Sequence, residues 1–353
     1  MLRAAAVMTV IAMCPVLGFC QPAQEEFDYA DYETTRARFG ELYAAGELED
    51  GAELLEWALP RFPEHAMANA FNLAIVCCKL GRYERAMEVL EYAHERNLWF
   101  NSYAMAADVW DSLRVSARFD SILARNEALR QEAQQTAKPD MLVVTPEGYV
   151  DAAGEGGVAG GGGGTTYPLF IALHGGGSNI DEFRDVWTSD RLRSEFIVAY
   201  LQSSRLVGMG TYDWLQDLEI TRAEIADAFR RIVAEYPIAE DQVIVGGFSS
   251  GGAAALEVAL TGTVPVAGFV VLCPRWPDGF TEENVADSVK RGLRGTILTT
   301  EMDPALPDQE EMAGVLETAG MPNRLIVTPN VGHWIPDDLG AQIDRSIDHI
   351  RGE

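Results

Sequence analysis

The chain has 353 residues, of which 48% are hydrophobic and 9% aromatic, so we expect packed domains, about two for this length, and not a disordered chain. Acidic residues outnumber basic ones by 54 to 27, which leaves a formal net charge of −27. A surface of this sign repels phosphate backbones, so the composition argues against a nucleic-acid partner.

The first 20 residues are typical of a secretory signal peptide. Arg3 supplies the positive start, and the apolar stretch of residues 4–19 is too short for a stable membrane span. Cleavage after Cys20 would leave small residues, Gly18 and Cys20, at the third and first positions before the cut. A lipid anchor on Cys20 is the alternative, but Phe19 is bulky for the position before a lipidated cysteine. We expect a secreted or periplasmic protein with no transmembrane span after signal removal.

Five cysteines lie outside any pattern that would bind a metal or form a disulfide framework. Cys14 and Cys20 fall in or beside the signal segment, Cys77 and Cys78 are adjacent, and Cys273 ends an apolar run. We expect the last three to be small buried side chains, and we predict no metal site.

A self-similarity of 35 residues predicts a small helical repeat domain over residues 27–135. Three positions recur at this interval, since Gly46, Leu55 and Ala58 correspond to Gly81, Leu90 and Ala93. Gly81 marks a turn between two helices, and Ala74 and Ala86 are small enough for those helices to approach closely. A third, degenerate copy from about Tyr103 onward is interpreted as a cap.

The stretch from Asn69 to Ala86 resembles a tetratricopeptide helix pair. The resemblance implies peptide binding in a concave face, so a protein partner is one expectation for this domain. Because only two copies are well formed, packing against the neighbouring domain is the role that we favour.

Residues 140–353 have the texture of an α/β domain. Strand-length apolar runs lie near residues 141–145, 168–173, 196–201, 243–248, 267–273, 295–300 and 324–329. Amphipathic helices are predicted near residues 180–191, 219–236, 250–261, 281–292, 308–319 and 336–351. Apolar strands separated by helices specify a mostly parallel sheet covered on both faces. The glycine run at residues 160–164 lacks the lysine and spacing of a phosphate-binding loop, and we predict a surface loop there.

A serine flanked by glycines stands between a predicted strand and an Ala-rich helix. In Gly247-Phe-Ser249-Ser-Gly251 the glycines lack the Cβ atoms that would clash in a tight strand-to-helix turn. This is the pattern of a nucleophile elbow, with Ser249 as nucleophile. The helix begins at Ser250, so its free N–H groups point to where an oxyanion would form.

A glycine run follows the predicted strand at residues 168–173. In His174-Gly175-Gly176-Gly177, backbone can approach a ligand closely. This loop precedes the elbow, on a strand-to-helix connection of the kind that supplies a second oxyanion donor to an elbow serine; we assign this donor to Gly176, with Gly175 as the alternative. His174 is interpreted as a residue that orients the loop.

The elbow serine needs an acid and then a histidine further along the chain. Asp303 lies just beyond one predicted strand, and His333 just after the last one. The other four histidines fall in the repeat domain, the oxyanion loop or the terminal helix, so His333 is the predicted general base. Asp303 is preferred as the acid over Glu301, which is nearer the strand end, and Asp308, which is interpreted as a helix N-cap.

Over about residues 141–352 the chain resembles the phospholipase/carboxylesterase branch of the α/β-hydrolases. The shared features are the Gly-Phe-Ser-Ser-Gly-Gly elbow, the His-Gly-Gly-Gly loop, Asp303-Pro304 with Pro307 beyond, and Gly332-His333. The resemblance implies hydrolysis of a small-molecule ester or thioester through an acyl-enzyme, without a cofactor. Ser250 stands where glutamine is frequent in that branch, and the helical domain is an addition; both leave the substrate class open.

The short gap between Pro274 and Arg294 leaves no room for a large cap insertion, so we expect an open pocket. Trp214 and Trp334 are predicted to border it, with burial in the core as the alternative.

Two other functions stay open. One is a serine peptidase of the same fold; the other is a binding protein in which the repeats act and the hydrolase domain is vestigial. The presence of both Ser249 and His333 argues against a vestigial site.

Overall fold

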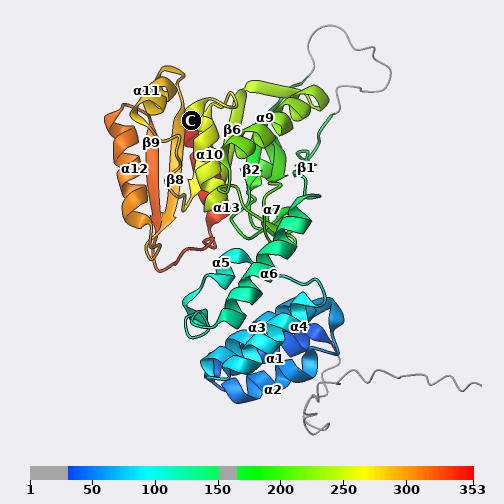
Figure 1. Ribbon diagram of the computed structural model, residues 1–353. Helices are drawn as coiled ribbons and strands as arrows, with labels where there is room; N and C mark the ends of the chain where they lie inside the picture. The colour runs from blue at the N-terminus through cyan, green and yellow to red at the C-terminus, as the bar shows by residue number, and fades with distance from the viewer. Residues whose placement is uncertain (1–30, 151–164) are drawn as a thin grey trace, which may run out of the picture. The chain divides into compact units, whose positions relative to one another are not determined.

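The computed structural model describes residues 31–150 and 165–353, which divide into two compact units (Figure 1). The smaller unit comprises the described residues up to Arg96 together with Asp108–Phe119, and the larger one comprises Asn97–Ala107 and Asp120–Glu353. This division by packing differs from the domain boundary near residues 135–140 that the sequence predicts. Whether each predicted domain folds independently stays a prediction. The predicted signal peptide and the glycine run at residues 160–164 lie outside the described residues.

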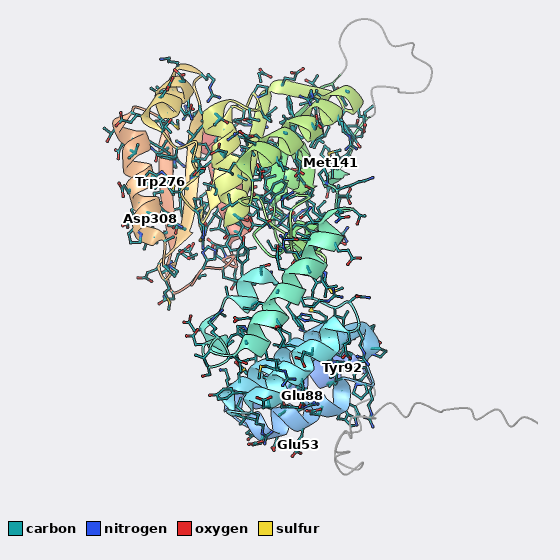
Figure 2. All side chains as sticks on the ribbon, viewed as in Figure 1. Glu53, Glu88, Tyr92, Met141, Trp276 and Asp308 are labelled. Atoms are coloured by element: carbon teal, nitrogen blue, oxygen red, sulfur yellow. The ribbon has the colours of Figure 1, made fainter. Side chains whose placement is uncertain are left out.

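The smaller unit is helical. It contains α1 (Tyr32–Ala45), α2 (Leu48–Ala58), η1 (Pro63–His65), α3 (Ala66–Lys79), α4 (Tyr83–His94) and η2 (Asp108–Trp110). Ala74 and Ala86 are completely buried where α3 packs on α4, and Gly81 turns between these helices with a φ of 70°. Glu53 and Glu88 are two of the exposed acidic side chains of this unit (Figure 2). The resemblance to tetratricopeptide repeats stays a prediction.

The larger unit is built on a seven-stranded sheet with the order β1-β3-β2-β6-β7-β8-β9. The strands are β1 (Asp140–Val144), β2 (Tyr167–Leu173), β3 (Ile197–Gln202), β6 (Ile238–Phe248), β7 (Gly268–Leu272), β8 (Arg294–Thr300) and β9 (Asn323–Thr328). Only β1 runs antiparallel to its neighbour in this sheet. The predicted α/β fold with a mostly parallel sheet is confirmed.

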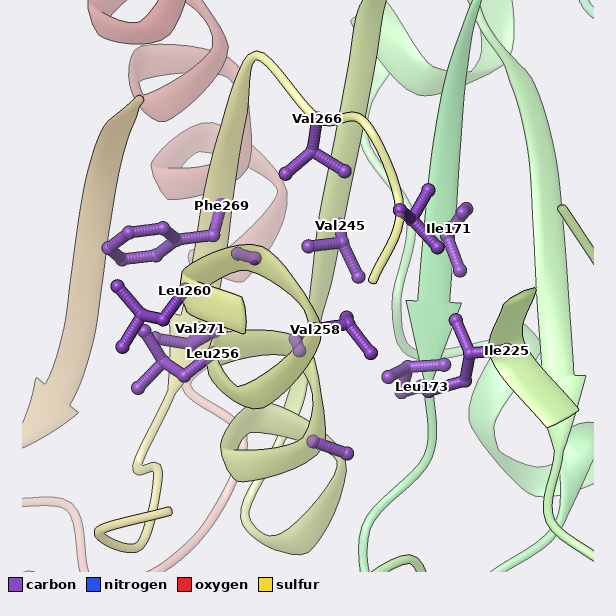
Figure 3. Close-up of a cluster of buried hydrophobic side chains, with 14 of the residues drawn as sticks. Ile171, Leu173, Ile225, Val245, Leu256, Val258, Leu260, Val266, Phe269 and Val271 are labelled. Atoms are coloured by element: carbon purple, nitrogen blue, oxygen red, sulfur yellow. The ribbon is translucent and has the colours of Figure 1, made fainter. Parts of the chain in front are cut away.

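Helices cover both faces of this sheet (Figure 1). One face packs on α9 (Leu218–Glu235), α10 (Ser250–Thr261), α11 (Glu282–Lys290) and α12 (Leu306–Thr318). The other packs on α7 (Ile180–Arg184), α8 (Asp190–Glu195) and α13 (Leu339–Arg351). Side chains of β2 alternate between them: Ile171 and Leu173 enter the first cluster (Figure 3), whereas Phe170 enters the second. The core thus holds the carboxyl ends of the parallel strands at one common edge.

Several predicted elements differ from those observed. The helix expected at residues 180–191 is two short helices, because Ser189 caps a new one by accepting a hydrogen bond from the Leu192 N–H. Asp308 was wrongly predicted as a helix N-cap, since α12 begins at Leu306 and puts Asp308 in its first turn. The hairpin of β4 (Leu206–Gly208) and β5 (Thr211–Tyr212), the short helix α5 (Ser102–Met105) and the length of α6 (Ala117–Gln134) had no counterpart in the prediction.

None of the helices within residues 31–150 and 165–353 combines the length and apolar character that a membrane crossing requires.

Candidate active site

Ser249 sits in a strained turn between β6 and α10. Its φ of 54° and ψ of −115° are unusual for a residue with a side chain. Glycine is required on both sides: a Cβ at Gly247 would lie 2.5 Å from the carbonyl oxygen of Leu173, and one at Gly251 would collide with the carbonyls of Leu173 and His174. The elbow therefore holds the serine hydroxyl above the edge of the sheet, as its sequence pattern predicts.

Three side chains from three strand ends meet at this edge. His333 Nε2 lies 2.9 Å from Ser249 Oγ, and His333 Nδ1 lies 2.9 Å from Asp303 Oδ2. The Asp303 side chain is almost fully buried, while that of His333 is 39% exposed. The structure thus brings together, in one hydrogen-bonded line, the three residues that the sequence nominates as nucleophile, base and acid.

Asp303 is held as a carboxylate. Burial acts to raise its pKa, but hydrogen bonds from Cys273, the Ala305 N–H, His333 and Gln309 outweigh that effect and hold the pKa below its usual value. The Ala305 N–H donates over 2.8 Å to Oδ1, and Gln309 Nε2 donates over 3.3 Å to Oδ2. The resulting negative charge faces the Nδ1 edge of the imidazole, where it would stabilise an imidazolium.

The two alternative acids lie elsewhere. Glu301 is exposed, and its Oε2 accepts a hydrogen bond of 2.9 Å from the Asn330 N–H. Asp308 is exposed on α12. Neither contacts His333 in the structure.

Two backbone N–H groups, those of Ser250 and Gly176, are the predicted oxyanion donors. Ser250 is the first residue of α10, and first-turn N–H groups have no partner within their helix. In the glycine loop, the Gly177 N–H is used by a 2.8 Å hydrogen bond to the Tyr212 carbonyl, and Gly175 is buried beside Phe248. Gly176 is exposed, and its N–H has no acceptor among the residues that the structure describes. The geometry thus favours Gly176 over Gly175 as the second donor.

His174 and Trp214 hold the glycine loop in place. The Trp214 indole N–H donates a 3.0 Å hydrogen bond to the His174 carbonyl, and His174 Nδ1 lies 2.7 Å from the Gly175 carbonyl oxygen. Burial lowers the pKa of His174 to about 4, so its ring is neutral near pH 7. Trp214 is only 1% exposed, so of the two places that the sequence leaves open for it, the pocket border and the core, it occupies the core. Its ring packs on that of His174, with the two centroids 5.2 Å apart.

Trp334, the other predicted pocket residue, is 70% exposed directly after His333. A further contact next to the glycine loop, which the sequence does not predict, is a 2.9 Å hydrogen bond from the Tyr103 hydroxyl to Asp213 Oδ2. Tyr103 had been assigned to the third helical repeat, and no sequence motif connects it with Asp213.

Cys273, Asp303 and His333 could offer metal-ligand atoms within 4.8 Å of one another. Burial raises the pKa of the Cys273 thiol to about 12, so this thiol stays protonated, whereas a coordinating cysteine must be a thiolate. Both ring nitrogens of His333 are already engaged, one by Asp303 and one by Ser249. The donor set fits a proton relay and does not fit a metal centre.

Comparisons with known proteins agree with this architecture. Residues 170–297 match the model of the alpha/beta hydrolase family, a span that includes the glycine loop and Ser249. The solved structure of an uncharacterized protein from Bacillus cereus is 21% identical, with a TM-score of 0.50, and the match covers 91% of this chain and 99% of that one. No curated protein sequence matches the chain.

Two solved enzyme structures resemble the chain more distantly. A carboxylesterase from Bacillus cereus is 16% identical, with coverage of 63% of this chain and 99% of that one and a TM-score of 0.45. A phospholipase/carboxylesterase from Dyadobacter fermentans is 14% identical, with coverage of 60% and 97% and a TM-score of 0.44. The order of the parallel strands, the elbow that carries Ser249 and the family match together identify the larger unit as an α/β-hydrolase domain.

Proposed function

We propose that the protein is a serine hydrolase that cleaves carboxylic esters or thioesters through an acyl-enzyme intermediate. The observation that carries this proposal is the line of hydrogen bonds from Ser249 through His333 to Asp303, each 2.9 Å long. A hydroxyl next to an imidazole that a buried carboxylate orients is an activated nucleophile. The strained backbone of Ser249 supports the same role, because such strain gathers at functional sites.

The mechanism follows from these contacts. His333 Nε2 takes the proton of Ser249 Oγ as the oxygen bonds to the ester carbonyl carbon. Asp303 holds the proton on Nδ1 and stabilises the imidazolium. The Ser250 and Gly176 N–H groups stabilise the oxyanion, each by about 3 kcal/mol. His333 then protonates the leaving alcohol or thiol as its bond to the carbonyl breaks.

Deacylation repeats these steps with water as the nucleophile. His333 removes a proton from water while the oxygen attacks the acyl carbon, and the proton then returns to Ser249 Oγ as the acid leaves. Ser249, His333 and the attacking water account for every proton that moves, so the proposed reaction draws on no cofactor. The names of the carboxylesterase structures agree with an ester substrate, as does the family match.

We favour esters over peptides as substrates because, among the described residues, the only unit besides the hydrolase domain is a small helical one, which is not of the kind that restricts access to peptides. A serine peptidase would use the same three residues. The helical unit could bind a protein partner, and residues 1–20 favour action outside the cytoplasm; both are further proposals from the sequence.

A fluorophosphonate probe tests the nucleophile. We expect the wild-type protein to be labelled, and the Ser249→Ala variant to lose both labelling and turnover. Absence of wild-type labelling, or equal labelling of the variant, would exclude a serine hydrolase. Turnover of p-nitrophenyl acyl esters of increasing chain length, compared with peptide anilides, then separates the two substrate classes. Faster turnover of the anilides would favour the peptidase.

A further inference from the structure

The segment Asn97–Ala107, which contains α5, lies against the glycine loop of the proposed active site. By its packing, Asn97–Ala107 belongs to the same compact unit as Ser249. Within it, Asn101 caps α5 by accepting hydrogen bonds from the Tyr103 N–H (2.8 Å) and the Ala104 N–H (3.3 Å). The same Asn101 side chain would lie 3.1 Å from a Cβ built on Gly177, so α5 is seated next to the glycine loop.

Tyr103 reaches from α5 to Asp213. Its hydroxyl donates a 2.9 Å hydrogen bond to Asp213 Oδ2. The other carboxylate oxygen accepts a 2.5 Å hydrogen bond from the Leu215 N–H. Asp213 itself is 2% exposed, so these two donors replace much of the water that its charge would otherwise bind. Burial, and then the charge of Asp213, raise the pKa of Tyr103, which keeps the hydroxyl protonated as a donor.

The Asp213 carboxylate is packed against Gly176, one of the two proposed oxyanion donors. Asp213 Oδ2 occupies the space that a Cβ on Gly176 would need. A Cβ built on Gly176 would also lie 3.1 Å from Ser250 Oγ. A buried negative charge here has two consequences. The carboxylate fixes where the Gly176 backbone can lie. If the carboxylate moved toward the pocket, its negative charge would repel the negative charge that develops on the carbonyl oxygen of the substrate.

We propose that Tyr103 is a positioning residue for the oxyanion hole, whose hydroxyl holds the Asp213 carboxylate against Gly176. The Asn97–Ala107 segment, which precedes the central sheet in the chain, then completes the catalytic site, and the rate of turnover depends on it. This inference rests on the proposed serine hydrolase function. It concerns how the site is held and leaves the identity of the acyl group open.

The Tyr103→Phe variant removes the hydroxyl and keeps the ring, at a side chain that is 54% exposed and therefore tolerant of the change. With a p-nitrophenyl acyl ester we expect kcat to fall about tenfold, because the lost hydrogen bond is to a charged group, while KM changes little. The inhibition constant of an alkylboronic acid, which mimics the tetrahedral intermediate, should rise by a similar factor. If Tyr103 had a purely structural role, the variant would have a lower melting temperature, but the fall in kcat would not be matched by a rise in the inhibition constant.

Tyr83→Phe is the matched control. Tyr83 is 41% exposed on α4 in the other unit, and we expect its variant to keep wild-type kcat and inhibition. A second variant, Asp213→Asn, tests the partner. If the two residues act as one unit, the kcat of the double variant should be no lower than that of the slower single variant.

The possible failures can be told apart. Wild-type kcat and inhibition in Tyr103→Phe would overturn the inference while Ser249 still reacts with the fluorophosphonate probe. Multiplicative losses in the double variant would also overturn it. Failure of the probe to label wild-type Ser249 would overturn the proposed function and this inference with it.

Discussion

The indole N–H of Trp214 donates a 3.0 Å hydrogen bond to the carbonyl oxygen of His174, the residue at which β2 gives way to the glycine loop. Both side chains are buried, and their rings are 5.2 Å apart. The contact joins the segment after the β4–β5 hairpin to the loop that carries Gly176. A residue without access to substrate therefore controls the position of a proposed oxyanion donor.

Replacement of Trp214 by Phe should slow turnover and destabilise the domain. The variant leaves the buried His174 carbonyl without its donor, at a cost of about 1–3 kcal/mol in the free energy of unfolding. We expect kcat to fall more than KM changes. Urea unfolding and ester kinetics measure the two effects.

Trp187→Phe is the control for this change. Trp187 is equally buried, but its indole N–H has no hydrogen-bond partner among the described residues. Its variant makes a cavity of the same kind without breaking a hydrogen bond, so it should keep wild-type kcat. Equal loss of kcat in both variants would contradict the role of the Trp214 contact.

Asp303→Asn should reduce kcat about 10⁴-fold, because an amide no longer stabilises the imidazolium and favours the wrong tautomer of His333. The alternative acids provide controls: Glu301→Gln and Asp308→Asn change exposed side chains that do not contact His333. Steady-state kinetics on one ester compare the three variants. A larger loss in Glu301→Gln than in Asp303→Asn would reassign the acid.

Gly251→Ala should destabilise the hydrolase domain by about 1–3 kcal/mol or more, because the new methyl group collides with the carbonyls of Leu173 and His174. Gly314 offers a matched substitution, since it is exposed within α12 and a Cβ there meets no atom within 4 Å. Gly314→Ala should instead stabilise the protein by about 0.5–1 kcal/mol. Chemical denaturation measures both, and similar stability changes would refute the steric argument.

His174 should make stability depend on pH below neutrality. Its pKa is about 4 in the folded protein, whereas an unfolded histidine titrates near 6.5. Between these values the unfolded chain binds a proton that the folded one does not, so stability rises with pH. Its contribution is complete above about pH 6.5 and falls by on the order of 3 kcal/mol as the pH drops to about 4.

Urea unfolding of wild type and His174→Gln over pH 4–7 measures this slope. The variant should lose the part that belongs to His174, whereas His65→Gln, at a partly exposed histidine, should retain it. An unchanged slope in His174→Gln would assign the pH dependence to other groups.

Much of the hydrolase domain could be predicted because its signals are local. The helix expected at residues 250–261 is observed as Ser250–Thr261, since a buried strand, a glycine turn and an Ala-rich stretch define its start. Parallel strands place their carboxyl ends at one edge of the sheet. For that reason, residues placed just after predicted strands, such as Asp303 and His333, could be expected to meet Ser249.

Contacts between distant segments could not be predicted in this way. Tyr103 and Asp213 are 110 residues apart, and Tyr103 fell within a repeat pattern that indicated helix packing. The sequence leaves two places open for Trp214, the pocket border and the core. An aromatic residue near a site suits either place, and hydrophobic periodicity does not separate the two. The break between α7 and α8 depends on a single cap at Ser189.

The sequence by itself determined the chain order of the seven strands of the main sheet and of the longer helices that cover it, the turn at Ser249 and the set of residues able to act as acid and base. These depend on side-chain size, backbone freedom and chain order. The tertiary structure decided which acid faces His333, which glycine N–H stays free, and that Tyr103 is held beside the glycine loop. Those choices depend on how loops from separate strands pack together, since burial and hydrogen-bond geometry arise only when the segments meet.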